Sequence, residues 1–267
     1  MLEAPVAGRL VLAVVLWLPL LLRLACRFSW TIFSRSLMRF FSAGDWARRV
    51  NGKKFDTGEL AKGEFAHKLP TGFQSSVLNT RRPLLQDARV REALGLAVDF
   101  DWMSRQMFYG AYQRVNGIFG NTLCETHGSP APAELALMEP WRKQLPAAAF
   151  GPMTVPPSTL PPSSLRDNLR RAKQLLADAG WTVQDGVLRN AKGQAMELEY
   201  LDSGDSARLI SSWSRNLEKL GITLKLHNVD FALYQQRQDK FDFDIITLNV
   251  PGTHNPGQDY AELFGSA

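Results

Sequence analysis

The strongest constraint on the fold is a regular alternation of amphipathic helices and short strands between residues 164 and 250. In the helical segments apolar residues recur every three to four positions, and in the strands they alternate with polar ones. The helices are expected at residues 164–180, 206–220 and 230–236, and the strands at 196–201, 222–226 and 243–249. Helices that alternate with strands pack onto a shared sheet, so the pattern predicts an α/β lobe with a mixed sheet flanked by helices.

Elements of the same kind are expected upstream. Residues 75–80 are typical of a short strand, and Pro83 is expected to keep its predecessor extended and to prevent a helix from beginning there. Asp87 and Asp99 are expected to open two helices as N-caps. Residues 128–164 are rich in proline, which predicts an irregular surface segment, whereas residues 181–189 are typical of a hairpin.

The charge distribution argues against nucleic acid as a partner. The net charge of the 267 residues is +5, but residues 1–50 hold seven Arg, no Lys and only two acidic residues. The remaining residues hold 24 basic and 24 acidic side chains. The body of the chain therefore has no excess of positive charge for phosphate.

The N-terminal segment has a different composition. Residues 10–22 are an uninterrupted apolar run, which is shorter than the roughly 20 residues that a spanning helix needs but suits the core of a secretory signal. Arginines are more numerous after the run than before it, which favours a cytoplasmic location for the following chain. Residues 27–41 are basic and aromatic, as in a helix that lies along a membrane surface. A signal or anchor and an abnormal start or shifted frame both remain open for residues 1–43.

Motifs of catalysis and metal binding are absent from the sequence. We find no nucleophile elbow, phosphate-binding loop or zinc-protease pattern. The histidines are isolated, and two cysteines exclude a disulfide scaffold; Cys124 is expected to be a small, semi-buried residue. We therefore expect a protein that is not an enzyme and has no cofactor and no metal.

Two charged pairs have a structural and a functional interpretation. Asp242 and Asp244 lie two residues apart and could act as acid and base, but they are better explained as the entry turn of a strand. Arg81 and Arg82 could grip a carboxylate, although a solvated pair at the start of a loop is the simpler interpretation.

Four local patterns, in order, resemble the extracellular solute-binding proteins of family 5, the peptide-binding components of ABC importers. The patterns are residues 78–84 with 87–94, residues 108–112, residues 168–181, and residues 220–224 with 241–246. The stretch 241–246, followed by Pro256-Gly and by residues 263–266, is most similar to the YejA-type subgroup. The resemblance covers about residues 45–267.

This resemblance implies a class II periplasmic binding protein that closes two lobes over a short peptide. Oligopeptides or peptide-like compounds would be held by main-chain hydrogen bonds in the cleft between the lobes. The implied partners are that ligand and the ABC permease subunits in the membrane, with a monomeric receptor in the periplasm that could be membrane-associated through residues 10–26.

Family members are about twice as long as this chain, so the resemblance predicts mainly one lobe. We expect a leader over residues 1–43, a remnant of the first lobe and the hinge over 44–72, the solute-binding distal lobe over 73–250, and a truncated return segment over 251–267. A membrane-tethered α/β interaction module and an inactive truncated gene product are the alternative interpretations.

The resemblance also suggests cleft residues. In many relatives the strand that corresponds to residues 243–250 leads into a Trp and then an Asp that pairs with the amino terminus of the peptide. Val250 and Thr253 occupy those places here, so recognition of an amino terminus is in doubt. The expected ligand-binding residues are Asn249, Val250, Thr253, Tyr109 and Tyr112.

Overall fold

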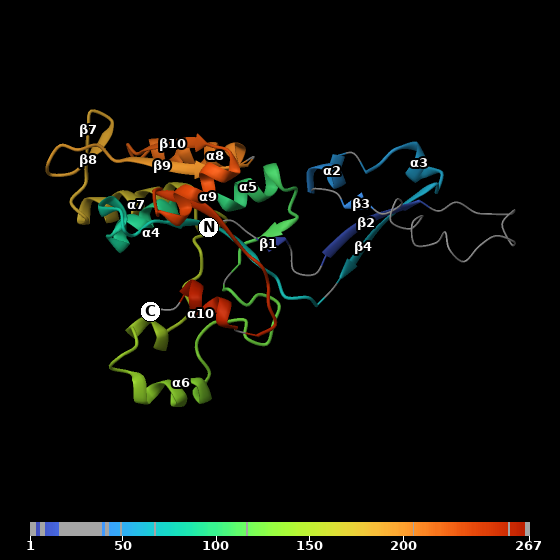
Figure 1. Ribbon diagram of the computed structural model, residues 1–267, viewed down its shortest axis with the longest axis horizontal. Coiled ribbons are helices and arrows are strands. Elements are labelled where there is room, and N and C mark those ends of the chain that lie inside the picture. The colour runs from blue at the N-terminus through green and yellow to red at the C-terminus, as the bar shows by residue number, and fades with distance from the viewer. Residues whose placement is uncertain are drawn as a thin grey trace, which may run out of the picture.

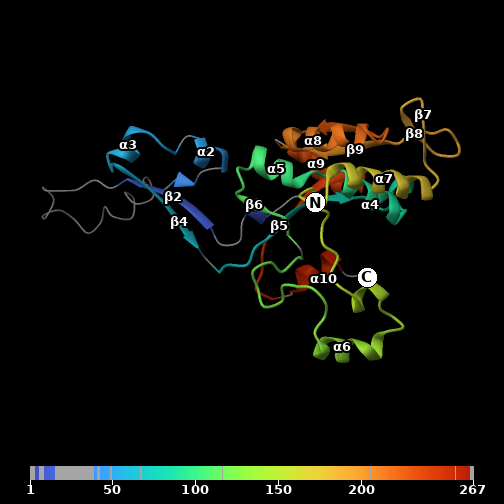
Figure 2. The ribbon, with the colours of Figure 1, turned by 180° about the vertical axis from the view of Figure 1, so that it is seen from behind.

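The computed structural model describes most of the chain (Figure 1). The described residues are 4–5, 9–15, 39–40, 43–48, 50–66, 68–115, 117–204, 206–255 and 257–264. The main body lies at one end of the elongated chain, and a smaller three-stranded sheet extends away from it in both views (Figures 1 and 2).

The main body is built on a four-stranded mixed sheet of order β10-β9-β11-β5. The strands are β5 (Phe73–Leu78), β9 (Glu197–Asp202), β10 (Thr223–Asn228) and β11 (Ile245–Val250). Strands β9, β10 and β11 are parallel to one another, whereas β5 pairs antiparallel with β11. The fold class and the mixed sheet are therefore as expected.

Three helices form the main core against one face of the sheet. They are α4 (Ala88–Leu96), α7 (Leu165–Asp178) and α8 (Ala207–Glu218). Their buried residues pack with Leu198 and Tyr200 of β9 and with Ile245 of β11 in one apolar cluster. Trp213 of α8 meets Tyr200 edge-on, with ring centroids 6.3 Å apart, and donates its indole N–H to the carbonyl oxygen of Leu94.

The opposite face carries α9 (Phe231–Asp239) and a smaller apolar cluster. Tyr234 of α9 packs with Leu201, Phe243 and Ile246, and Val77 of β5 packs against them, so one helix and three strands contribute to this cluster. The hydroxyl group of Tyr234 also donates to the carbonyl oxygen of Thr247, which joins α9 to β11.

The remaining elements lie outside the four-stranded sheet and its main helices. They are β1 (Ala4–Pro5), β2 (Arg9–Val15), β3 (Arg39–Phe40), α2 (Ala43–Arg48), α3 (Lys53–Asp56), β4 (Leu60–Ala66), a 3-10 helix (Pro83–Leu85), α5 (Phe100–Met107), β6 (Tyr112–Gln113), α6 (Pro132–Met138), 3-10 helices at Glu139–Trp141 and Ala147–Phe150, β7 (Thr182–Gln184), β8 (Val187–Arg189) and α10 (Gln258–Phe264). The proline-rich segment thus contains short helical pieces within an otherwise irregular path.

Part of the N-terminal apolar run lies in a strand. Residues 10–15 belong to β2, which pairs antiparallel with β4 in the sheet of order β3-β2-β4. Residues 16–38, where most of the proposed leader falls, lie outside the described residues. Within the part of the chain that the structure describes, no helix has the length and apolar character needed to cross a membrane. The division of the chain at residues 43, 72 and 250 stays a prediction.

Local capping signals are confirmed. The carboxylate of Asp87 accepts from the backbone N–H of Arg89, and that of Asp99 accepts from the N–H of Trp102. Ser164 caps α7 in the same way. The expectation that no helix begins at Pro83 is wrong: Arg82 is extended, as expected, but a 3-10 turn starts at the proline, whose fixed φ suits a first helical position.

The interpretation of Arg82 as a solvated residue is also wrong. Pairing of β5 with β11 brings Arg82 beside the start of β11, where its guanidinium lies 2.9 Å from Asp242 and 3.1 Å from Asp244. Asp242 also meets Arg237 of α9, which lies 2.5 Å from Glu199 of β9. These alternating charges join the turn after β5, strand β9, helix α9 and the entry to β11.

This network predicts a loss of stability in acid. Burial raises the pKa of Glu199, but hydrogen bonds from His227 and Arg237 outweigh it, so the pKa lies below its ordinary value. The hydrogen bond from Arg82 likewise lowers the pKa of Asp242. Carboxylates with lowered pKa values stabilise the fold above their unfolded values of about 4, and the stabilisation is lost as the pH falls through the folded values.

We expect the free energy of unfolding, measured by urea titration, to decrease from about pH 5 downwards. Glu199→Gln lowers stability at neutral pH and makes the acid slope shallower, because Arg237 loses its charged partner. Glu218→Gln, at an exposed helical position, serves as the matched control. An unchanged acid slope in Glu199→Gln would contradict the assignment.

Candidate functional site

The candidate site lies where β5 begins and β11 ends. These two strands run antiparallel, with Phe73 opposite Val250, so the segments before β5 and after β11 leave the sheet together. At Gly72 an added Cβ would lie 2.3 Å from the carbonyl oxygen of Val250, and at Gly252 it would lie 2.6 Å from that of Pro70. The two segments are therefore in direct backbone contact, which only glycine permits.

A loop and a helix hold this crossing in place. The backbone N–H of Thr71 donates to the carbonyl oxygen of Gly120, and the carboxamide of Asn121 donates to that of Leu69. The hydroxyl group of Tyr260, in α10, donates to the carbonyl oxygen of Pro251. Tyr260 is buried, and its ring centroid lies 4.8 Å from that of Phe119. The return segment after β11 is thus fixed to the same loop as the entry segment.

On the main-core face of the sheet, the side chains of β5 and β11 change from apolar to polar toward this crossing. Leu78 opposite Ile245 is the last apolar pair, Ser76 opposite Thr247 comes next, and Gln74 opposite Asn249 follows. The hydroxyl group of Tyr200 lies 3.0 Å from Oγ of Ser76 and 2.8 Å from Oγ1 of Thr247. Burial raises the pKa of Tyr200, so its hydroxyl group is neutral and joins the three strands by hydrogen bonds.

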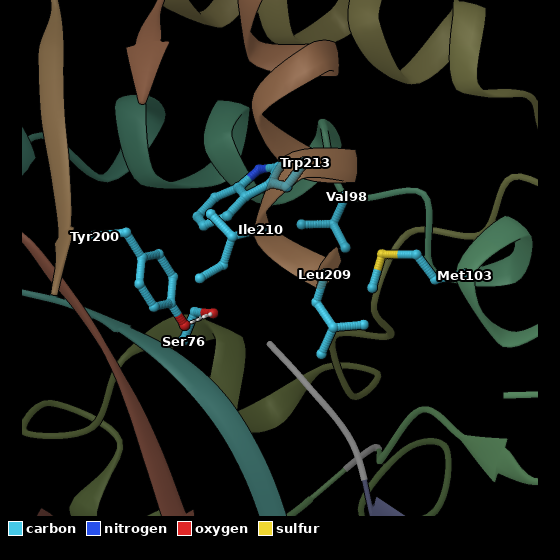
Figure 3. A pocket seen from close by; sticks show the side chains of 7 residues that line it. All are labelled: Ser76, Val98, Met103, Tyr200, Leu209, Ile210 and Trp213. Atoms are coloured by element: carbon cyan, nitrogen blue, oxygen red, sulfur yellow. Dashed lines mark hydrogen bonds between the residues drawn. The ribbon is translucent and has the colours of Figure 1, made fainter. Parts of the chain in front are cut away.

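A small cavity lies beside this hydroxyl cluster (Figure 3). Its volume is about 20 Å³, which is room for a single water molecule. The cavity is lined by Ser76, Val98, Met103, Tyr200, Leu209, Ile210 and Trp213. It is too small for a ligand of peptide size.

The carboxyl ends of the parallel strands lie at the same edge of the sheet. Asp202, at the end of β9, is buried and accepts from the backbone N–H and the hydroxyl group of Ser206. Asn228, at the end of β10, donates to the carbonyl oxygen of Gly204. Ligands of open α/β sheets bind at this edge. The hydrogen bonds of Asp202 and Asn228 hold the loop after β9 against it.

The structure brings three of the five predicted ligand-binding residues together. Asn249 is exposed at the end of β11, and Thr253 is half-buried, with its hydroxyl group donating to the carbonyl oxygen of Asn255. Val250 is buried, with 4% of its surface exposed, and its carbonyl oxygen faces Gly72.

The two tyrosines lie elsewhere. Tyr109 has a positive φ of 53° and is exposed, with the guanidinium of Arg48 5.5 Å from its ring centroid. Tyr112 packs edge-on against Phe108 and against the main core. Among the described residues, neither tyrosine has a hydrogen bond or ring contact with residues 249–253.

Sequence reasoning missed Gln74, the hydroxyl cluster and the two close-approach glycines. Thr71-Gly72 and Pro251-Gly252 flank the two paired strands, and this was the available signal for a tight crossing. Cys124 was expected to be semi-buried but is exposed, because the loop that contains it lies on the surface. Within the described ranges, no three His, Cys, Asp or Glu side chains are grouped to hold a metal ion.

The site therefore lies on an α/β body with a mixed sheet flanked by helices, in which the entry and exit strands are paired. Residues 36–267 match the family model described as "Bacterial extracellular solute-binding proteins, family 5 Middle". The chain belongs to this family, and the resemblance found in the sequence is confirmed.

Curated relatives place the chain near YejA-type proteins. It is 34% identical to "Uncharacterized protein YejA" of Escherichia coli over 206 residues, which cover 76% of this chain and 34% of that protein. It is 34% identical to "Probable peptide-binding protein YejA" of Agrobacterium fabrum, covering 73% of this chain and 32% of that protein. The chain therefore spans about a third of the length of the curated relatives it matches.

Solved structures support the fold. The oligopeptide-binding protein AppA of Bacillus subtilis, in complex with a nonapeptide, superposes with a TM-score of 0.53 at 20% identity, over 72% of this chain and 33% of that chain. NikA of Brucella suis, in complex with Fe(III)-EDTA, gives a TM-score of 0.52 at 23% identity, over 73% of this chain and 34% of that one.

Because the two backbone segments are in contact at Gly252, adding one methyl group there is expected to lower the stability of the fold strongly. Gly252→Ala would overlap backbone atoms on the neighbouring segment, which cannot rotate away as a side chain can. We expect the free energy of unfolding to fall by about 1–3 kcal/mol. In α4, Gly95 has open space around its Cβ position, so Gly95→Ala should raise stability by roughly 0.5–1 kcal/mol. Equal effects of the two substitutions in urea titrations would contradict the close packing.

Proposed function

We propose that this chain forms the distal lobe of the substrate-binding component of an ABC importer for oligopeptides or peptide-like compounds. The family and the fold are those of substrate-binding proteins, which are not enzymes. The observation that carries the proposal is the Gln74–Asn249 pair beside the glycine crossing.

The chemistry of this pair suits a peptide backbone. A carboxamide offers both a donor and an acceptor, as does each peptide group. The side chains of Gln74 and Asn249 make no hydrogen bonds with other described residues, so both are available to a ligand. Recognition by main-chain hydrogen bonds tolerates varied side chains.

The ligand would lie in a cleft between this lobe and a second one. Asn249 and Thr253 would contribute side chains, and the buried Val250 would support them from below, next to the paired segments that connect the lobes. Hinge closure about two adjacent segments buries a ligand and creates the closed form that a permease can distinguish. Tyr109 and Tyr112 remain proposed contacts, and since they make no hydrogen bond or ring contact with Thr253 they would meet another part of the ligand.

The names of relatives support this class of ligand. One matched protein is called a probable peptide-binding protein, and another, 29% identical and also from Agrobacterium fabrum, is called "Peptidoglycan-binding protein YepA". Both names describe compounds with peptide groups. The permease subunits of an importer are the partners that this function requires, and the family's extracellular description supports a periplasmic location. Association with the membrane through residues 10–26 stays a prediction.

A binding experiment can test the carboxamide pair directly. In the ¹⁵N-labelled 267-residue chain, a mixed library of di- to octapeptides should shift the side-chain amide signals of Gln74 and Asn249. One lobe supplies one wall of the cleft, so we expect a Kd of about 1 mM, equivalent to about 4 kcal/mol. Asn249→Ala should weaken binding about five-fold, because a neutral hydrogen bond contributes about 1 kcal/mol.

The matched control is Gln144→Ala, at an exposed position outside the sheet. It should leave the peptide affinity unchanged, whereas Gln74→Ala should reduce it to a similar extent as Asn249→Ala. Peptide binding that shifts neither carboxamide, or that is equally strong in all three variants, would refute the proposed site.

A further inference from the structure

A second, larger pocket lies away from the hydroxyl cluster. Its volume is about 550 Å³, within the range of small-molecule sites. It is bounded by α5, by β6 and the arginine that follows it, and by residues 155–160 of the proline-rich segment. Its apolar lining includes Phe100, Val155 and Leu160.

Hydrogen bonds fix the wall formed by residues 155–160. One carboxylate oxygen of Asp101, in the first turn of α5, accepts from the backbone N–H of Thr159 at 2.6 Å and from the hydroxyl group of Ser158 at 2.8 Å. The hydroxyl group of Thr159 donates to Asp99 at 2.6 Å. The guanidinium of Arg114 donates to the carbonyl oxygen of Pro157 at 2.6 Å. The pocket is thus built from segments that are anchored to each other.

Some polar side chains of the pocket already make hydrogen bonds, whereas others have no partner among the described residues. Asp101 is engaged by the wall, and Arg114 holds Pro157. Arg105 lines the pocket from α5, is exposed, and has no ion-pair partner in the described part of the chain. The hydroxyl group of Tyr112 likewise makes no hydrogen bond with any described residue. With two arginines and one aspartate, the pocket has an excess of positive charge.

We propose that this pocket binds a monocarboxylate with an apolar body, such as an aryl or branched alkyl acid. The apolar body would lie against Phe100, Val155 and Leu160, and the carboxylate would pair with the free guanidinium of Arg105. A guanidinium binds a carboxylate with two parallel hydrogen bonds, which favours the acid over a neutral analogue of the same shape. This site does not include the Gln74–Asn249 pair, and Tyr112 is the one residue it shares with those proposed to bind the peptide.

The test compares two probes of nearly equal shape. N-acetyl-L-phenylalanine carries the carboxylate and N-acetyl-L-phenylalaninamide lacks it. By calorimetry with the full chain, the acid should bind at least ten-fold more tightly than the amide. Arg105→Gln should remove this preference while leaving the affinity for the amide unchanged. Val155→Trp, which fills the pocket from an exposed position, should weaken both probes.

Arg215→Gln, at an exposed position on α8, is the matched loss of charge and should change neither affinity. Circular dichroism establishes that each variant is folded. Equal affinity of the wild-type chain for acid and amide would overturn the proposal. The proposal would also be overturned if Arg105→Gln kept the preference for the acid, or if Val155→Trp left the affinity for both probes unchanged. Asn249→Ala should bind both probes as the wild type does, which separates this site from the peptide site.

Discussion

The pairing of β5 with β11 is the contact on which the rest of the main body depends. It joins two segments far apart in sequence, completes the mixed sheet, and brings Gly72 and Gly252 into backbone contact. The same pairing places Arg82 next to Asp242 and Asp244, and sets Gln74 opposite Asn249. Stability and the candidate ligand surface therefore arise from one strand pair.

The two faces of the sheet are stabilised differently. On the main-core face, apolar side chains of three helices surround Leu198, Tyr200 and Ile245. On the other face, α9 covers a small apolar cluster, and the alternating charges of Arg82, Asp242, Arg237 and Glu199 lie alongside it. The stability of the face covered by α9 therefore depends on pH through these ion pairs. The stability of the main-core face depends mainly on its buried apolar area.

Much of the fold could be predicted because its signals are local. The caps at Asp87 and Ser164 and the hairpin within residues 181–189 each depend on a few neighbouring residues. The site could be predicted less well, because its members meet only through strand register. Gln74 carries no local signal, and its importance follows from its position opposite Asn249. Arg82 was misjudged for the same reason, since its carboxylate partners lie about 160 residues away in sequence.

The long separation of β5 and β11 also bears on how the chain folds during synthesis. β5 emerges from the ribosome well before its partner, so its backbone N–H and C=O groups have no ladder until residues 245–250 follow. An unpaired strand is open to wrong partners, including strands of other copies. The parallel pair β9–β10 and the helices around it can assemble first. Closure of the sheet by β11 is then the step that pairs one edge of β5, which becomes the outer strand of the four-stranded sheet, and it also forms the candidate ligand surface.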